Sequence, residues 1–173
     1  ALRDAAAISL LSLIPPDRVG CIRKLRLFHT LKRKDGGGGW KMDLTKQRDG
    51  HKTSRFYGPF AASLPAELTP ILDKYCSVLE LEGGSDAGPY LFHPPQSHFD
   101  RPMESSAWSA WVKRLFKRHH GEEIAPKTLR SVFVTWLRDN TQAPEVLKSA
   151  AHAMKHSEAR QGSAEYDKEK DDR

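Results

Sequence analysis

The chain has little cysteine, no long apolar run, and no histidine or cysteine spacing typical of a metal site. Its two cysteines, Cys21 and Cys76, lie far apart and fit no metal-ligand spacing. As two lone thiols they favour a reducing, intracellular setting. The apolar stretch at the start carries two charges and ends at the Pro15–Pro16 pair. It is therefore too short and too charged for a transmembrane span or a signal peptide, and no membrane partner is expected.

An initial methionine is also missing, which predicts a fragment of a longer protein. The 173 residues are enough to bury a core, and we expect one domain over residues 1–173. With 38% hydrophobic and 29% charged residues, the composition indicates a soluble, globular protein rather than a disordered one. The glycine run at 36–39 lacks a following helix and the Gly-Lys-Ser/Thr ending, which argues against a nucleotide-binding P-loop.

Positive charge is concentrated in two parts of the chain. Residues 1–58 hold 13 Lys and Arg against 5 Asp and Glu, a net of +8, and residues 113–160 hold 10 against 5, a net of +5. Between them, residues 61–104 hold 2 against 7, a net of −5. Two basic lobes around an acidic stretch indicate a DNA-facing surface with a solvent-facing back. Cations that only solvate the surface would give the same counts, so charge alone leaves both interpretations open.

The hydrophobic pattern predicts an α+β protein that is mainly helical. Apolar residues at helical spacing, with prolines near the starts and glycines after the ends, indicate the helices. Alternating runs bounded by turns indicate a small antiparallel sheet of two or three strands. The expected helices cover 2–14, part of 15–25, 65–84, 105–121, 125–139 and 143–154. The expected strands cover 25–31, 39–44, and 54–60 with 61–65 behind it, and an irregular connection covers 85–102.

The turns of this sheet carry many cations. The link at 32–39 is basic and rich in glycine, and the link at 46–53 forms a second turn. A flexible hairpin beside DNA and an ordinary surface loop both fit these links. Their basic residues are Lys32, Arg33, Lys34, Lys46, Arg48 and Lys52.

The expected helix at 105–121 has two contrasting faces. Its aromatic and aliphatic stripe is more typical of a core than of a base-stacking platform, and we expect it to be buried. The opposite, basic face is a candidate phosphate contact. The apolar face comprises Trp108, Trp111, Val112, Leu115 and Phe116, and the basic face comprises Lys113, Arg114, Lys117 and Arg118.

The C-terminal part of the chain carries the groups that a phosphodiester-cleaving tyrosine requires. Lys127 and Arg130 lie three positions apart on an expected helix, so they share one face and should point away from the core. His156 closes the next apolar helix, and Tyr166 follows in a segment poor in apolar residues, as suits a mobile nucleophile. Upstream, Arg18 lies at a proline-fixed corner, where we expect it to be partly buried. The apolar side behind Lys127 and Arg130 comprises Leu129, Val132, Phe133, Val134, Trp136 and Leu137.

This order of residues resembles the catalytic domain of tyrosine recombinases, the phage-integrase family. Arg18 matches the first arginine of the family and Lys52 the lysine of its β-hairpin. The segment KTLRSVFVTWL resembles the family's HxxR helix, and KHSEARQGSAEY resembles its GHS…Y segment. The resemblance covers nearly the whole chain, and PPDR and MKHS are closest to eukaryotic mobile-element branches. It implies the fold shared with type IB topoisomerases, and it implies that the family's N-terminal DNA-clamping domain is absent from this chain.

Three positions depart from the family pattern. Lys127 replaces the usual histidine, Cys21 stands where an acidic residue commonly follows the first arginine, and Lys155 replaces the glycine before His156. A lysine in place of that histidine is similar to some type IB topoisomerases. The resemblance therefore implies a site-specific recombinase or integrase, with a type IB topoisomerase as one alternative and a catalytically inactive DNA-binding module as another.

The resemblance also implies a role for each catalytic residue. Arg18 and Arg130 would hold the non-bridging oxygens of the phosphate with forked hydrogen bonds, and His156 and Lys127 would assist. The residue that protonates the departing 5′-oxygen would be Lys52, although Lys46 lies in the same turn. The nucleophile would be Tyr166, which would form a 3′-phosphotyrosine.

No cofactor or metal is expected. His152 and His156 have a helical i, i+4 spacing, but no glutamate follows His152 and no third ligand is evident. The implied partners are double-stranded DNA and further copies of the chain, which would form a tetramer on DNA. The expected location is intracellular, and nuclear if the host is eukaryotic.

Overall fold

The chain folds into helices beside a small sheet. The computed structural model describes residues 1–15, 20–45, 60–83, 88–97 and 99–154. The helices of these residues are α1 (Leu2–Leu13), α2 (Gly20–Arg23), α4 (Thr69–Gly83), α5 (Ser105–His120), α6 (Pro126–Asn140) and α7 (Pro144–Ala153), with a 3₁₀ turn at Ala66–Leu68. The strands are β1 (Leu31–Arg33), β2 (Trp40–Asp43) and β3 (Ala61–Ser63). This mainly helical arrangement confirms the expected fold class. None of the described helices has the length and apolar character needed to cross a membrane.

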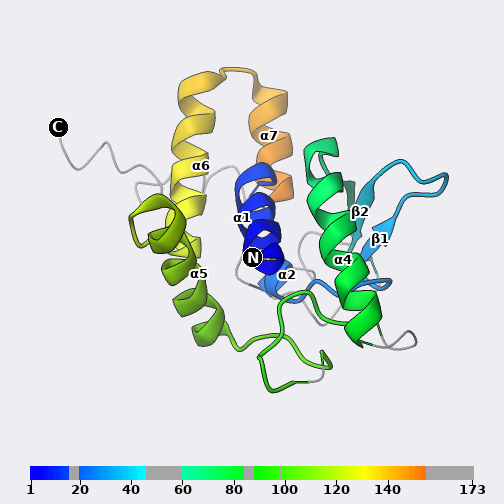
Figure 1. The fold of residues 1–173 in the computed structure, drawn as a ribbon. Helices are drawn as coiled ribbons and strands as arrows, with labels where there is room; N and C mark the ends of the chain where they lie inside the picture. The colour runs from blue at the N-terminus through cyan, green and yellow to red at the C-terminus, as the bar shows by residue number, and fades with distance from the viewer. Residues whose placement is uncertain (16–19, 46–59, 84–87, 98, 155–173) are drawn as a thin grey trace.

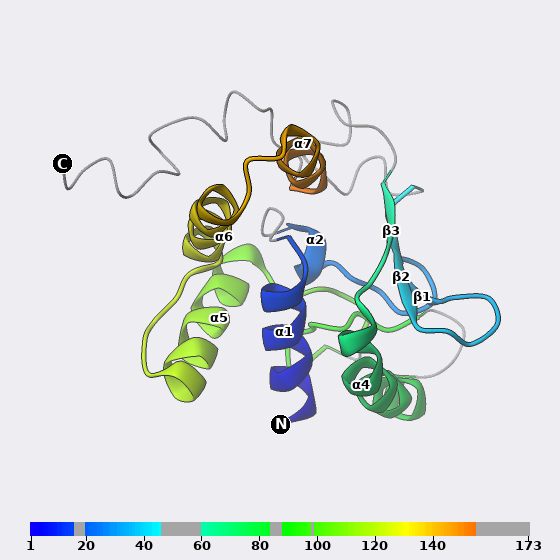
Figure 2. The ribbon, with the colours of Figure 1, turned by 90° about the horizontal axis from the view of Figure 1, so that it is seen from above.

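Helix α1 runs through the middle of the fold. It packs against α4 on one side and against α5 and α6 on the other (Figures 1 and 2). Ala6, Ala7 and Leu10 are completely buried, and the two alanines allow neighbouring helices to approach closely. The first apolar stretch of the sequence is therefore the centre of the core.

The aromatic stripe of α5 is part of the core, as predicted. Trp108 is 1% exposed, and its ring centroid lies 4.9 Å from that of Phe92 and 5.3 Å from that of Trp111. Phe92 comes from the irregular connection between α4 and α5, so these tilted ring contacts hold that connection against the helix.

The sheet has β2 as its central strand, paired antiparallel with β1 and β3. Leu31 lies opposite Met42, and both side chains are buried on the core side. The strand predicted at 39–44 is confirmed. For the third strand, the sequence placed the main run at 54–60; the strand is found at 61–63, and residues 54–59 lie outside the described part.

The first predicted strand, at 25–31, is wrong over most of its length because the chain turns there. The hydroxyl of Thr30 accepts a hydrogen bond of 2.7 Å from the N–H of Arg26, and the N–H of Leu31 donates to the Arg26 carbonyl at 3.0 Å. Phe28 adopts a φ of 65°, which interrupts an extended run. Local hydrogen bonds to a threonine side chain therefore override the β-propensity of this stretch, and the strand begins at Leu31.

Two cations that the sequence placed in a turn lie in β1 instead and pair with carboxylates. The ammonium of Lys32 lies 2.7 Å from a carboxylate oxygen of Asp43, and the guanidinium of Arg33 lies 2.9 Å from one of Asp73. The hydrogen bonds from Lys32 and Thr45 hold the pKa of Asp43 well below its ordinary value. Part of the predicted basic hairpin is thus neutralised within the fold, and the turn itself covers only residues 34–39.

The helix predicted at 65–84 divides into two parts. A 3₁₀ turn covers Ala66–Leu68, and the α-helix follows with Pro70 in its first turn. A proline lacks the backbone N–H that would extend the preceding turn but fits the start of a helix, which explains the division.

Gly88 is expected to be the glycine most sensitive to substitution in the described segments. Its φ is +59°, and a Cβ atom there would lie 2.2 Å from the Leu27 carbonyl oxygen and 2.8 Å from the His29 ring. The Leu27 backbone cannot easily move, because its N–H donates to the Pro89 carbonyl at 2.9 Å. Gly88→Ala should lower the free energy of unfolding by about 2–4 kcal/mol, measured by urea denaturation.

The control for this prediction is Gly121→Ala. Gly121 also has a positive φ, +91°, but nothing lies within 4 Å of its Cβ position. Its substitution should cost only about 1 kcal/mol, from backbone strain. Equal losses for the two variants would show that the close approach of Gly88 to Leu27 is unimportant.

Candidate active site

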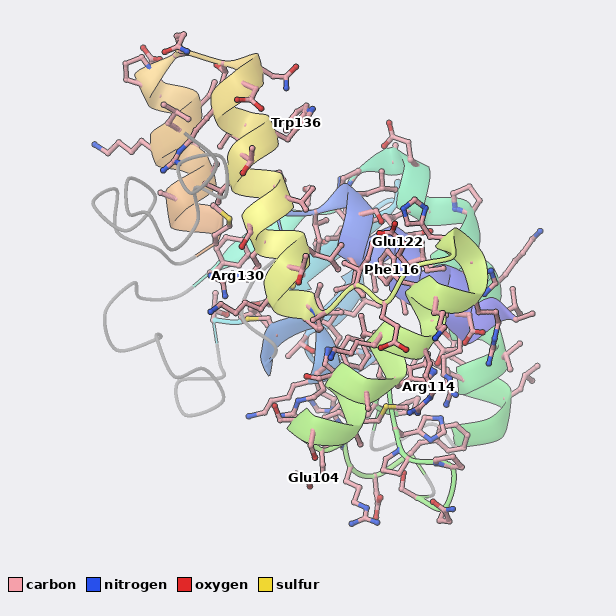
Figure 3. The ribbon with its side chains drawn as sticks, turned by 90° about the vertical axis from the view of Figure 1, so that its left-hand side faces the viewer. Glu104, Arg114, Phe116, Glu122, Arg130 and Trp136 are labelled. Carbon is pink, nitrogen blue, oxygen red and sulfur yellow. The ribbon has the colours of Figure 1, made fainter. Side chains whose placement is uncertain are left out.

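The described part of the candidate site lies where the start of α6 meets the end of α7. A short link joins the two helices into an antiparallel pair, so these ends are neighbours (Figures 1 and 3). α6 begins with Pro126, which favours the first helical position, and Lys127 follows with its side chain exposed. Arg130 comes one turn later. The helix predicted at 125–139 and the one predicted at 143–154 are both confirmed.

Arg130 is buried and holds these two helix ends together. It is 6% exposed, and its Nη2 donates a hydrogen bond of 3.4 Å to the Met154 carbonyl. Met154 directly follows α7, is completely buried, and donates its own N–H to the Ala150 carbonyl at 2.9 Å. Because a buried guanidinium costs free energy unless it is hydrogen-bonded, this contact fixes the orientation of Arg130. Figure 3 shows Arg130 on the side of α6 that faces the end of α7.

The predicted orientation of α6 is partly wrong. Lys127 points to solvent as expected, but Arg130 lies on the buried side together with Val134 and Leu137. Val132 and Trp136, which the sequence placed on the buried side, are 57% and 56% exposed. The buried stripe follows the i, i+4, i+7 spacing from Arg130, which leaves Val132 and Trp136 on the outer face. Figure 3 shows Trp136 on the side of the helix away from α7.

The other predicted site residues lie outside the described residues. These are Arg18, Lys52, His156 and Tyr166, together with the alternative Lys46. Their roles therefore stay predictions. In the sequence, Arg18 precedes the first residue of α2 by two positions, and His156 follows Met154 by two positions.

The described side chains offer neither a metal site nor a reactive thiol. Within the described segments, no group of three or more His, Cys, Asp or Glu side chains is placed to hold a metal ion. Cys21 and Cys76 are both buried. Burial raises the pKa of the Cys76 thiol to about 12, so this thiol stays protonated near neutral pH.

Sequence reasoning missed the contact between Arg130 and the Met154 carbonyl. The two residues are 24 positions apart, and a backbone carbonyl carries no sequence signal. The sequence offered one signal, which was an arginine within an apolar pattern. A cation at i, i+4 spacing from residues that are buried indicates a side chain that is hydrogen-bonded or functional.

Nine solved chains match this fold, XerA recombinase and the Tn1549 transposon integrase among them. XerA recombinase matches with a TM-score of 0.66 and 19% identity, over 96% of this chain and 52% of that one. The Tn1549 transposon integrase, solved in complex with transposon right end DNA, matches with a TM-score of 0.56 and 17% identity, over 98% of this chain and 58% of that one. Both are tyrosine recombinases, so the chain has a tyrosine-recombinase-like fold.

The likeness is one of fold rather than of sequence. No family model and no curated protein sequence matches the chain. The chain spans between half and three fifths of the length of the two solved structures. The structural match and the residue order noted in the sequence are two separate observations that indicate the same fold.

Proposed function

We propose that this chain is the catalytic domain of a site-specific DNA recombinase or integrase that cuts and rejoins DNA through a covalent 3′-phosphotyrosine. The observation that carries the proposal is the buried Arg130, held by the Met154 carbonyl in a chain with a tyrosine-recombinase-like fold. A fixed, buried guanidinium is suited to binding an anion. It needs little reorganisation when negative charge develops on the phosphate in the transition state. Its five N–H donors allow it to contact a carbonyl and a phosphate together.

The proposed reaction needs only side chains and DNA. The phenolic oxygen of Tyr166 attacks the phosphorus, its proton leaves to a base, and the bond from phosphorus to the 5′-oxygen breaks. Arg18 and Arg130 donate to the non-bridging oxygens, with support from His156 and the exposed Lys127. Lys52 gives its proton to the departing 5′-oxygen. In the rejoining step a 5′-hydroxyl attacks the phosphotyrosine, so the energy of the first bond is retained.

The proposed partner is double-stranded DNA, on which the protein would assemble as a tetramer. The integrase neighbour was solved with transposon DNA, which supports a DNA partner and a mobile-element setting for this chain as well. An intracellular location, nuclear in a eukaryotic host, is part of the same proposal.

DNA binding by this chain should weaken steeply with salt. The sequence carries a formal charge of +6, and phosphate contacts by Lys and Arg release counterions. If six to ten phosphates are contacted, affinity should fall by about 10³–10⁵ between about 50 and 200 mM salt. Fluorescence anisotropy of a labelled duplex across that salt range measures the slope, and a flat response would contradict a DNA-binding role.

The proposed activity can be tested with nicked suicide substrates. These trap the covalent intermediate because the short fragment beyond the cut diffuses away and cannot be rejoined. A protein–DNA adduct that survives denaturation supports the enzyme. Exchange between two sites distinguishes a recombinase from a type IB topoisomerase, which would relax supercoiled DNA without site preference. Salt-dependent binding with no adduct on any substrate tested would indicate an inactive DNA-binding module.

A further inference from the structure

A positively charged cavity lies away from the α6–α7 contact. It has a volume of about 480 Å³ and lies between the start of α1, the part of α5 up to Arg114, and residues 94–96, 101 and 103 of the connection before α5. This volume is within the range of pockets that hold small organic ligands. Neither Lys127 nor Arg130 lines it. Within the described part of the chain, the lining of the cavity is therefore separate from the described residues of the candidate site.

The walls of this cavity are fixed by the fold. The N–H of Met103 donates to the Phe92 carbonyl at 2.8 Å, and the Met103 carbonyl accepts a hydrogen bond from Arg23. The ring of Trp111 packs against Trp108. Pro94 and Pro95 add a rigid apolar surface to the lining. A preformed pocket with apolar walls binds a flat group at low cost in conformational entropy.

Three arginines line the cavity against one carboxylate. Arg3, Arg101 and Arg114 contribute the positive charge, and Glu104 is the acidic residue. Among the ion pairs of the described residues, none involves these three arginines. By contrast, Arg118, which lies on α5 as Arg114 does, is paired with the carboxylate of Asp4 at 3.2 Å. The cavity thus has positive charge that the described part of the fold does not neutralise.

One of these arginines is already held in position. The guanidinium of Arg3 lies over the ring of Trp111, 5.0 Å from the ring centroid. Such a cation–π contact restricts the side chain while its N–H groups can still bind an anion. Figure 3 shows Glu104 at the start of α5 and Arg114 farther along that helix, which are the two ends of the α5 wall.

We propose that this cavity binds a nucleoside phosphate, either a free nucleotide or a terminal nucleotide of a DNA strand. Guanidinium groups form forked hydrogen bonds that match phosphate oxygens, and three of them suit a dianionic phosphate. The proline, methionine and tryptophan walls suit a flat base. This binding does not depend on the cleavage reaction, so either proposal can fail without the other.

The test is calorimetric titration of the full chain with deoxyadenosine monophosphate. We expect tighter binding than for inorganic phosphate or deoxyadenosine alone. Arg114→Ala and Arg101→Ala should each weaken binding by about tenfold, because each removes a charge-assisted hydrogen bond to phosphate. Both side chains are exposed, so neither change should disturb folding. The matched control is Lys113→Ala on the same helix: Lys113 is exposed and does not line the cavity, so affinity should change less than about twofold.

Three results would overturn this proposal. The first is no binding of deoxyadenosine monophosphate at millimolar concentration. The second is an equal loss of affinity in Lys113→Ala and Arg114→Ala, which would indicate nonspecific attraction. The third is a loss in Arg130→Ala but not in Arg114→Ala, which would place the nucleotide at the cleavage site. A parallel titration with a short 5′-phosphorylated deoxyadenylate strand identifies the source of the phosphate, and binding of either ligand that depends on Arg114 supports the site.

Discussion

Tyr166→Phe is expected to abolish the covalent protein–DNA adduct while DNA affinity stays close to that of the wild type. This result is expected because the variant loses only the phenolic oxygen that would attack phosphorus. It loses no charge, so the attraction to phosphates is preserved. The measurement is a denaturing gel of end-labelled suicide substrate, together with anisotropy for binding. Adduct formation at the wild-type rate in Tyr166→Phe would contradict the assignment of the nucleophile.

The matched control for Tyr166→Phe is Tyr90→Phe. Tyr90 is half-buried, its ring lies 5.3 Å from the Arg26 guanidinium, and phenylalanine can keep that contact. The control should form adducts at the wild-type rate. A loss of adduct in both variants would indicate a general effect on folding rather than loss of a nucleophile.

Arg130→Ala is expected to lower the rate of adduct formation by about 10²–10³, by analogy with the loss of other transition-state donors. The variant should also lose stability, since the Met154 carbonyl would lose its buried donor at a cost of about 1–3 kcal/mol. Rates must therefore be measured on protein shown to be folded by circular dichroism, well below its unfolding temperature. Arg130→Lys keeps the positive charge but loses the forked pair of N–H donors. Its rate of adduct formation should lie between those of Arg130→Ala and the wild type.

Two further measurements separate catalysis from structure at Arg130. Arg138→Ala removes the same charge from the last turn of α6 and should leave the rate of adduct formation nearly unchanged. If the role of Arg130 is only structural, Arg130→Ala will have a lower unfolding temperature but will form adducts at the wild-type rate per folded molecule. That outcome would contradict its place in the proposed active site.

The helices were predictable because their signals are local. Proline at helix starts and apolar spacing along the chain located α6 and α7, and Trp108 was correctly placed in the core. The turn at 26–31 was not predictable, because its residues favour strands and the competing hydrogen bonds of Thr30 appear only in the folded chain. Likewise, the periodicity of α6 fits more than one buried stripe, and tertiary packing selected the one that contains Arg130.

The site could be predicted only in part, for the same reason. The order of the proposed catalytic residues can be read along the chain, whereas the contact of Arg130 with Met154 depends on how α6 and α7 pack. The arginine-lined cavity combines α1, α5 and the connection before α5, and no short stretch of sequence carries its pattern. Local structure was therefore predictable, but the convergence of distant segments was not.

The most direct test of the account is to identify the residue joined to DNA in the trapped wild-type complex. Trypsin should release the peptide QGSAEYDK, residues 161–168, which contains Tyr166. We predict that mass spectrometry finds a nucleotide on this peptide, attached at Tyr166, and that a label at the 5′ end of the cut strand stays with the protein, as a 3′-phosphotyrosine requires. An unmodified peptide with DNA attached to another residue, or a label that leaves with the released fragment, would contradict it.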